Sequence, residues 1–252
     1  MHESGYASLG LPFTYFPFRV SNLDDAIRGM RGLGIRGFGV SHPFKQKVIN
    51  LLDALDPVAA RIGAVNTIVN DDGRLVGHNT DWVGAVRALE EVCGLDRARV
   101  LLVGAGGAGR AIAFGLGERG ALVTIANRDE ERARKLSEET SARFASLEET
   151  SRASEYDVIV NATTLGQADV APTLSAIPEK ALRRGQVVMD IVYKPVRTPL
   201  VELATNAGAT VVHGGRMLLH QAAAQFELYT NRSAPLAVMD AALRLAIPHP
   251  TL

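Results

Sequence analysis

Apolar and polar positions change period along the first third of the chain, and these changes predict alternating strands and helices. Asn22 precedes an amphipathic stretch that closes on glycine, so we expect it to cap a helix. Two strand-like runs, AVNTIVN and RLVGHN, surround Asp71-Asp72-Gly73 and predict a β-hairpin. The elements expected before residue 94 are strands over 13–20 and 35–40, helices over 22–34, 44–55 and about 80–93, and this hairpin.

From residue 99 the strands become nearly continuous apolar runs, which indicates a different kind of sheet. The runs are RVLLVG, ALVTIAN, YDVIVNAT, QVVMDIV and ATVVHG, and a helix is expected after each of the first two. Strands of this kind are typical of a parallel sheet with helices on both faces. Two further helices, broken near Pro235, are expected from about Met217. We predict an α/β fold of two domains, one over 1–82 completed by 217–252 and one over 83–216.

Composition and charge exclude several classes of function. Lysine plus arginine equals aspartate plus glutamate, 27 against 27, without a block of like charge. This balance argues against a nucleic-acid groove or an anionic membrane partner and favours a small-molecule ligand. Cys93 is the only cysteine and the histidines lack ligand spacing, so we expect no disulfide and no metal site. With no signal-peptide pattern and no run of about 18 apolar residues, a cytoplasmic soluble protein is expected.

The stretch RVLLVGAGGAGRAIAFGLGERG predicts a strand, a glycine-rich turn and a helix. Gly104 would allow the tight turn, Gly106 would let the backbone approach a pyrophosphate, and Gly109 would let helix and strand pack closely. The free N–H groups at the helix N-terminus suit an anion. The alternative is a tight strand-to-helix turn without a ligand. The pattern therefore predicts a Rossmann-type dinucleotide site made by Gly104, Ala105, Gly106, Gly107, Ala108 and Gly109.

The end of the next strand bears on the choice of nucleotide. NAD sites usually have an acid about 20 residues after the glycine motif, whereas NADP sites have an arginine near the 2′-phosphate. Asn127 stands at the acid's position, Arg128 follows it, and Arg132 comes one helical turn later, which favours NADP. Asp129 lies between the two arginines and would repel a phosphate, so NAD stays possible. An ordinary solvated helix start is the other interpretation of these arginines.

Oxidation of an alcohol requires a group that relays the hydroxyl proton and a donor that stabilises charge on the oxygen. The stretches SHPFKQK and GHNTD contain lysines and an aspartate suited to both tasks. With these residues included, the chain resembles the shikimate dehydrogenase family over nearly its whole length. Nine stretches match in the family's order: GLPFTYFPFRV, LGIRGFGVSHPFK, IGAVNTIV, GHNTDWVGA, VGAGGAGRA, NRDEERA, NATTLG, DIVYKPVRTPL and GGRMLLHQAAAQFELYT.

The resemblance implies the reaction and its catalytic pair. It implies NADP-dependent, reversible oxidation of shikimate to 3-dehydroshikimate, or of a close cyclitol acid, in the chorismate pathway of aromatic amino acid biosynthesis. The family's lysine and its partner acid correspond to Lys45 and Asp81. Because a carboxylate stabilises an adjacent ammonium, we expect Lys45 mainly to orient the reacting hydroxyl while the proton leaves through the pair. Lys47 has no such counterpart and is expected at the surface.

The resemblance also implies further binding residues in both predicted domains, which it identifies as a substrate domain and a nucleotide domain. Asn66 could alternatively satisfy backbone groups at a strand end. His42 has no family role and is expected to be a loop residue. The implied substrate-binding residues are Ser41, Asn66, Tyr193 and Gln221, and those lining the nicotinamide half are Asn161, Thr163, Ile191 and Gly214.

Two departures from the family pattern keep other functions open. Gly39 stands where the family usually has an asparagine. Family members also have a first strand and a serine-bearing SxSP loop that holds the substrate carboxylate, and these precede the position of His2. The alternatives are a quinate or aminoshikimate dehydrogenase, an NAD-preferring relative, or a nucleotide-binding regulator with a decayed substrate pocket. Either a monomer or a homodimer is compatible with the sequence.

Overall fold

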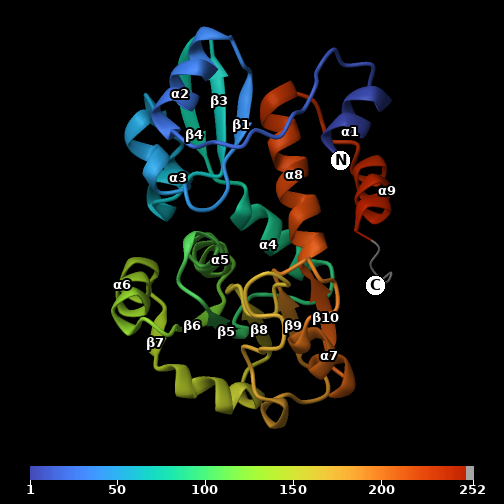
Figure 1. Cartoon of the computed structure of the whole chain (residues 1–252). Coiled ribbons are helices and arrows are strands. Elements are labelled where there is room, and N and C mark those ends of the chain that lie inside the picture. Colours follow the sequence, from blue (N-terminus) through green and yellow to red (C-terminus); the bar gives the residue numbers. More distant parts are fainter. Residues whose placement is uncertain (248–252) are drawn as a thin grey trace.

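The computed structural model describes residues 1–247 and contains two sheets joined by two helices (Figure 1). Helices α4 (Asp81–Glu90) and α8 (Gly214–Thr230) pack against each other between the sheets. A Cβ on Gly84 would lie 2.6 Å from the carbonyl oxygen of Met217, so a glycine is needed where the helices touch. The chain is therefore a two-domain α/β protein, as predicted.

The N-terminal sheet is mixed and has four strands in the order β1-β3-β4-β2. The pairs β1–β3 and β3–β4 are antiparallel, while β2 runs parallel to β4. Asp72 and Gly73, with φ of 50° and 91°, form the two-residue turn of the β3–β4 hairpin, which confirms the prediction. The strands are β1 (Gly37–Gly39), β2 (Ala54–Leu55), β3 (Thr67–Asp71) and β4 (Arg74–His78), and the helices are α1 (His2–Ser8), α2 (Leu23–Gly32), the 3₁₀ helix η1 (Lys47–Leu51) and α3 (Pro57–Ile62).

The second sheet is parallel throughout, with six strands in the order β7-β6-β5-β8-β9-β10. This is the Rossmann order, in which the strand order reverses between β5 and β8 and leaves a crevice at their carboxyl ends. Its elements are β5 (Arg99–Val103), α5 (Gly107–Glu118), β6 (Leu122–Ala126), α6 (Glu130–Thr140), β7 (Arg143–Ala145), η2 (Leu147–Glu155), β8 (Val158–Asn161), η3 (Glu179–Ala181), β9 (Val187–Asp190), α7 (Pro199–Asn206) and β10 (Thr210–His213); α9 (Leu236–Ala246) follows α8.

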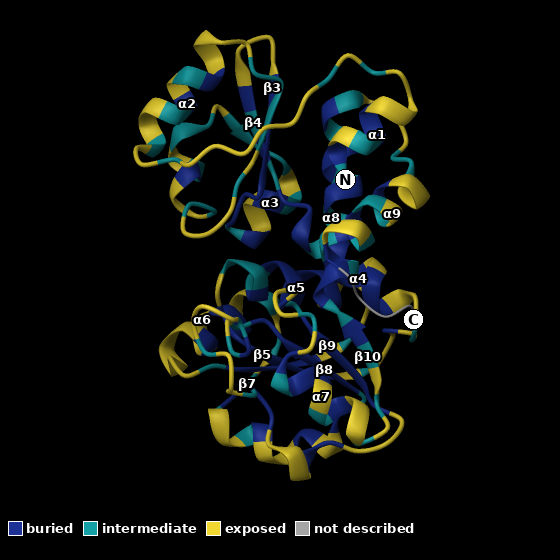
Figure 2. Cartoon of the chain, turned by 45° about the vertical axis from the view of Figure 1, so that its right-hand side comes forward, coloured by how far each residue is buried: buried dark blue, intermediate teal, exposed yellow. Residues whose placement is uncertain are grey.

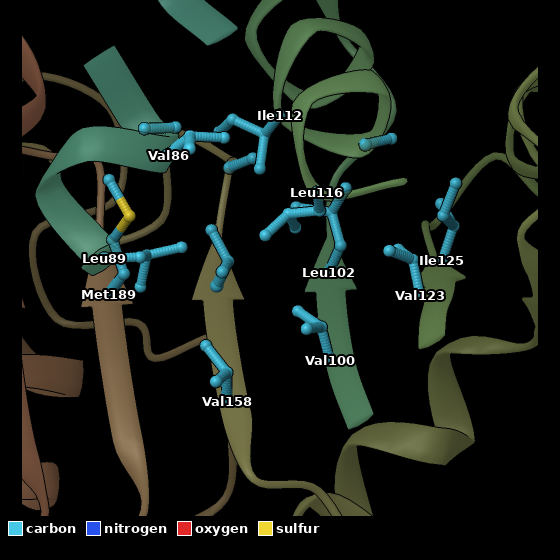
Figure 3. Packing of buried hydrophobic residues seen from close by; sticks show 14 of the residues in the cluster. Val86, Leu89, Val100, Leu102, Ile112, Leu116, Val123, Ile125, Val158 and Met189 are labelled. Carbon is cyan, nitrogen blue, oxygen red and sulfur yellow. The ribbon is translucent and has the colours of Figure 1, made fainter. Parts of the chain in front are cut away.

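The largest apolar core lies between the parallel sheet and the two helices α4 and α5. Figure 3 shows Leu116 of α5 above Leu102 of β5, which is fully buried, and Leu89 of α4 beside Met189 of β9. Figure 2 shows the central strands buried while the outer helices keep an exposed face. Since α5 follows the glycine-rich turn, this packing fixes the N-terminus of α5 relative to the sheet.

Two predicted elements are wrong. Residues 13–20 form no strand, because Pro17 lacks an N–H for a ladder and β1 pairs only with β3. The predicted helix over 44–55 is replaced by η1 and the short strand β2. There the Asp53 N–H donates to the carbonyl oxygen of Leu75 at 3.0 Å, and the Asp53 carboxylate accepts from the Leu75 N–H at 2.7 Å. Pairing with β4 therefore replaces the helical hydrogen bonds.

Other predicted elements are confirmed with shorter bounds. The side chain of Asn22 accepts a hydrogen bond from the Asp25 N–H and caps α2 as predicted. The predicted domain boundaries at 82 and 217 fall within the first turns of α4 and α8, and they stay a prediction. Over residues 1–247, no helix is both long and apolar enough to cross a bilayer. Sequence analysis did not predict α1, α3, β7 or α7.

Candidate active site

A cavity of about 1220 Å³ opens between the four-stranded sheet and the N-terminus of α5. Its wall joins the two halves of the predicted site. From the substrate side it includes Lys45, Asn66, Asp81 and Gln221, and from the nucleotide side Ala108, Ile191, Tyr193 and Gly214. Residues predicted from separate motifs therefore share one cavity.

Lys45 and Asp81 form an ion pair in the wall of this cavity. Lys45 Nζ lies 2.5 Å from Asp81 Oδ2, and the side chains are 20% and 7% exposed. Asp81 occupies the first turn of α4, where the helix dipole favours a carboxylate. The carbonyl oxygen of Lys45 accepts from the Val65 N–H at 2.8 Å, which fixes the turn that carries the lysine. The pair is both shielded and positioned, whereas Lys47 is exposed as predicted.

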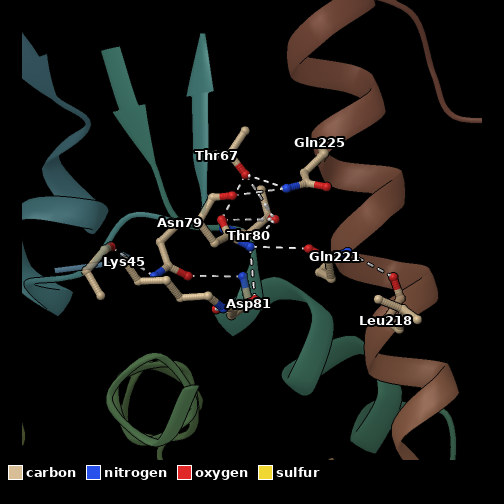
Figure 4. Close-up of polar contacts among 10 residues, drawn as sticks. Lys45, Thr67, Asn79, Thr80, Asp81, Leu218, Gln221 and Gln225 are labelled. Carbon is tan, nitrogen blue, oxygen red and sulfur yellow. Dashed lines mark hydrogen bonds and ion pairs between the residues drawn. The ribbon is translucent and has the colours of Figure 1, made fainter. Parts of the chain in front are cut away.

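Asn66 connects Asp81 of the pair to Gln221 of α8, two residues that Figure 4 labels. Its Nδ2 lies 2.9 Å from Asp81 Oδ1, 2.9 Å from Thr80 Oγ1 and 3.2 Å from Gln221 Oε1. An amide nitrogen has only two hydrogens, so these three acceptors share them. Asn66 Oδ1 also accepts from the Thr80 N–H at 2.7 Å. The alternative, that the Asn66 side chain hydrogen-bonds to backbone groups, is therefore partly correct. Its Nδ2, however, contacts Asp81 and Gln221 in the cavity wall.

The remaining predicted substrate residues lie around the same cavity. Ser41 is exposed on the wall, and Tyr193 is 39% exposed. On the next turn of α8, Gln225 Nε2 donates to Thr67 Oγ1 at 3.0 Å and to the carbonyl oxygen of Asn66 at 3.2 Å. No motif indicated Gln225, although its spacing of four residues from Gln221 places both on one helix face.

The glycine-rich turn has the geometry of a pyrophosphate cradle. Gly104 has φ of 116°, and a Cβ on Gly109 would lie 2.3 Å from the carbonyl oxygen of Gly104. A Cβ on Gly106, by contrast, would meet no atom within 4 Å. Among residues 1–247 no side chain caps the N-terminus of α5, so its N–H groups are available to an anion. The turn also lies close to the Lys45–Asp81 pair, because a Cβ on Gly107 would be 3.6 Å from Lys45 Cδ.

The end of β6 presents the predicted arginines to solvent. Arg128 is exposed and makes no hydrogen bond or ion pair with any of residues 1–247. Asp129 caps α6 through a 3.1 Å hydrogen bond from the Arg132 N–H, and its second oxygen lies 4.0 Å from Arg132 Nε. Asn127 Nδ2 donates to the carbonyl oxygen of Asp129 at 2.9 Å. Within the described part of the chain, Arg128 is therefore a free cation at this edge, whereas Asp129 partly neutralises Arg132.

Asn161 and Thr163 are not part of the cavity wall. Asn161 is fully buried; its Oδ1 accepts from Thr163 Oγ1 at 2.6 Å, and its Nδ2 donates to Asp190 at 2.9 Å. Burial raises the pKa of Asp190 to about 6, although Thr198, Val192 and Asn161 all donate hydrogen bonds to its carboxylate. This network fixes the loop that carries Ile191 and Tyr193. Asp190 begins the stretch DIVYKPVRTPL, but no motif predicted a role for it.

Comparison with known proteins agrees with this geometry. Residues 1–68 match the shikimate dehydrogenase substrate binding domain, 87–194 match shikimate/quinate 5-dehydrogenase, and 214–244 match the shikimate 5′-dehydrogenase C-terminal domain. A shikimate dehydrogenase (NADP(+)) of Natronomonas pharaonis is 42% identical over 252 residues, which cover 98% of this chain and 93% of the relative. The chain belongs to the shikimate dehydrogenase family.

Solved structures support the family assignment at the level of the fold. Shikimate 5-dehydrogenase from Thermus thermophilus, in complex with NADP(H) and shikimate, has a TM-score of 0.89 at 36% identity, covering 97% of this chain and 92% of that one. Quinate dehydrogenase from Corynebacterium glutamicum, in complex with NAD, has a TM-score of 0.87 at 31% identity, with the same coverage. Shikimate and quinate dehydrogenases, two of the possibilities that the sequence left open, therefore both occur on this fold.

Proposed function

We propose that this protein is an NADP-dependent dehydrogenase that oxidises a ring hydroxyl of shikimate, or of a close cyclitol acid, reversibly to the ketone. The observation that carries the proposal is the single cavity that contains both the Lys45–Asp81 pair and the N-terminus of α5. A polar ring placed in this cavity would lie next to whatever occupies the glycine-rich turn. Family membership supports the same reaction.

The residues present fit a dinucleotide. Gly106 would leave room for the pyrophosphate, α5 would supply its N–H groups, and Arg128 would face the 2′-phosphate. When bound, the nicotinamide accepts or donates the hydride. Ala108, Ile191 and Gly214 would border its ring, since they line the cavity near the catalytic pair.

Lys45 would hold the reacting hydroxyl by a charge-assisted hydrogen bond. Asp81 is held by two donors, Lys45 and Asn66, so it would keep the lysine oriented and receive the hydroxyl proton through it. Gln221 would contact the ring from α8. Because the pair is shielded from water, the electrostatic interactions would be stronger than at an exposed surface. We expect action in the cytoplasm, as a monomer or homodimer, without nucleic acid or membrane.

The test is absorbance of the reduced nicotinamide with shikimate or quinate and NADP⁺ or NAD⁺, in all four pairings. We expect the largest kcat/KM with shikimate and NADP⁺. Preference for quinate or NAD⁺ would support the alternative relative within the family. Silence in all four pairings, with NADP binding retained, would overturn the proposed reaction and favour a regulator.

A further inference from the structure

Tyr15 lies in the irregular segment between α1 and α2, yet its ring is held in place. The ring stacks on His2 with centroids 4.5 Å apart and planes 12° from parallel. His2 itself is buried, and the Tyr15 backbone N–H donates to the Glu3 carboxylate. The aromatic ring is therefore anchored to α1 on one side and lines the cavity on the other.

The hydroxyl of Tyr15 occupies space that Gly39 leaves open. A Cβ on Gly39 would lie 3.0 Å from the Tyr15 hydroxyl oxygen and 3.5 Å from Gln225 Nε2. The hydroxyl hydrogen-bonds to none of the residues from 1 to 247. Burial raises the pKa of Tyr15, so the phenol stays protonated at neutral pH and can act as a donor. An ordered donor without a partner in the described part of the chain thus faces the cavity.

The hydroxyl lies on the Gln225 side of the cavity. Gln225 lies one turn of α8 beyond Gln221, and Figure 4 shows Gln221 between Gln225 and Asp81. Gln221 contacts Asn66 Nδ2, which also contacts the Asp81 carboxylate, whereas Gln225 contacts Thr67 and the carbonyl oxygen of Asn66. A ring that presents one hydroxyl to Lys45 would therefore extend its opposite oxygens toward Gln225 and Tyr15.

We propose that Tyr15 is a substrate-binding residue whose hydroxyl donates a hydrogen bond to an acceptor oxygen at the end of the substrate remote from the reacting carbon. Gly39 allows this position of the hydroxyl, because the Cβ of any other residue at position 39 would lie only 3.0 Å from the hydroxyl oxygen. The inference rests on the proposed function and adds to it a contact that no motif predicted. It concerns ground-state binding, since the Tyr15 hydroxyl hydrogen-bonds to neither Lys45 nor Asp81.

The decisive variant is Tyr15→Phe, which keeps the ring and its stacking on His2 and removes only the hydroxyl. We expect the KM for shikimate to rise about tenfold, as for one lost hydrogen bond to a charged acceptor, while kcat and the KM for NADP⁺ stay within about twofold. Tyr6→Phe is the matched control, because Tyr6 is buried outside the cavity. It should leave the KM for shikimate unchanged.

Gly39→Ala gives a second, independent variant. Its Cβ would displace the Tyr15 hydroxyl by a few tenths of an ångström, so the KM for shikimate should rise about threefold. In the Tyr15→Phe background the same substitution should have no further effect, since the oxygen it displaces is gone. Equal effects of Gly39→Ala in both backgrounds would contradict the proposed coupling.

The outcomes separate this inference from the proposed function. If the wild type oxidises shikimate and Tyr15→Phe has the same KM, the Tyr15 contact is wrong while the reaction stands. If the wild type turns over no cyclitol acid, the reaction is wrong, and calorimetric titration of shikimate into both proteins decides the contact. Weaker shikimate binding by Tyr15→Phe would then support it, whereas equal affinity or no binding to either protein would overturn it.

Discussion

Lys45 and Asp81 are 36 residues apart in the sequence, yet their charged atoms lie 2.5 Å apart at the junction of the two sheets. Lys45 comes from the turn after β1, and Asp81 from the first turn of α4. The hairpin of β3 and β4 connects these segments and holds Asn66 against both Asp81 and Gln221. The pair is therefore positioned by segments next to the N-terminal sheet. Helix α4, which begins with Asp81, packs against the parallel sheet.

Replacement of Lys45 by Met should abolish most of the activity. The variant loses the cation that orients the reacting hydroxyl, so we expect kcat to fall by about 10²–10⁴-fold with the affinity for NADP⁺ little changed. Steady-state kinetics and NADP⁺ titration measure the two quantities. Lys47→Met is the matched control, because Lys47 is exposed two residues away and should keep wild-type kinetics. Full activity of Lys45→Met would contradict the catalytic assignment.

The fold was predictable from sequence wherever local pattern and tertiary contacts agree. Each strand of the parallel sheet from β5 to β10, except β7, is an apolar run, and burial on both faces requires such a run. Residues 13–20 show the opposite case. The aromatic residues there suggested a strand, but Tyr15, Phe16 and Phe18 instead form one wall of the cavity. An alternating pattern indicates one apolar face, and it does not tell whether a neighbouring strand supplies hydrogen bonds.

The site was predictable only in part, for a related reason. Family motifs located Lys45 and Asp81, and the structure brings them together. Neither motif nor periodicity indicated that Asn161 is turned inward to Asp190, or that Tyr15 reaches the space above Gly39. Those relationships depend on side-chain packing between segments distant in sequence. Local patterns contain no information about such contacts.

Replacement of Gly109 by alanine should lower the stability of the fold, whereas replacement of Gly106 by alanine should weaken NADP⁺ binding. In Gly109→Ala the new Cβ would overlap the Gly104 carbonyl oxygen, so we expect a loss of about 3 kcal/mol in the free energy of unfolding. In Gly106→Ala the Cβ meets no protein atom, so stability should be unchanged while the Kd for NADP⁺ rises at least about tenfold. Urea denaturation and calorimetric titration separate the two effects. Unchanged NADP⁺ affinity in Gly106→Ala would contradict the pyrophosphate site.

Arg128 and Asp129 should act in opposite directions on the choice of nucleotide. Loss of the cation in Arg128→Ala should raise the KM for NADP⁺ about 10-fold to 100-fold and leave the KM for NAD⁺ unchanged. Asp129→Asn keeps a good helix cap but removes the charge, so its KM for NADP⁺ should fall about threefold. The matched control is Arg134→Ala, which removes an exposed arginine of α6 that is paired with Glu130. Equal changes with both nucleotides would argue against a 2′-phosphate site here.

The buried His2 should make the folded protein sensitive to acid. Burial lowers the pKa of His2 from 6.5 to about 4, with a smaller contribution in the same direction from the positive N-terminus. The unfolded chain therefore binds the proton more readily, so this contribution to stability is complete above pH 6.5 and is lost as the pH falls toward 4. By linkage, the loss at pH 5 is about 2 kcal/mol.

We expect His2→Phe, which keeps an aromatic ring against Tyr15, to avoid this loss of stability. Urea denaturation of the wild type and of His2→Phe at pH 7.5 and pH 5 gives the decrease in unfolding free energy for each protein. The difference between the two decreases is the contribution of His2, because the opposite effect of Asp190 is the same in both. An identical decrease in both proteins would show that His2 titrates normally in the folded state.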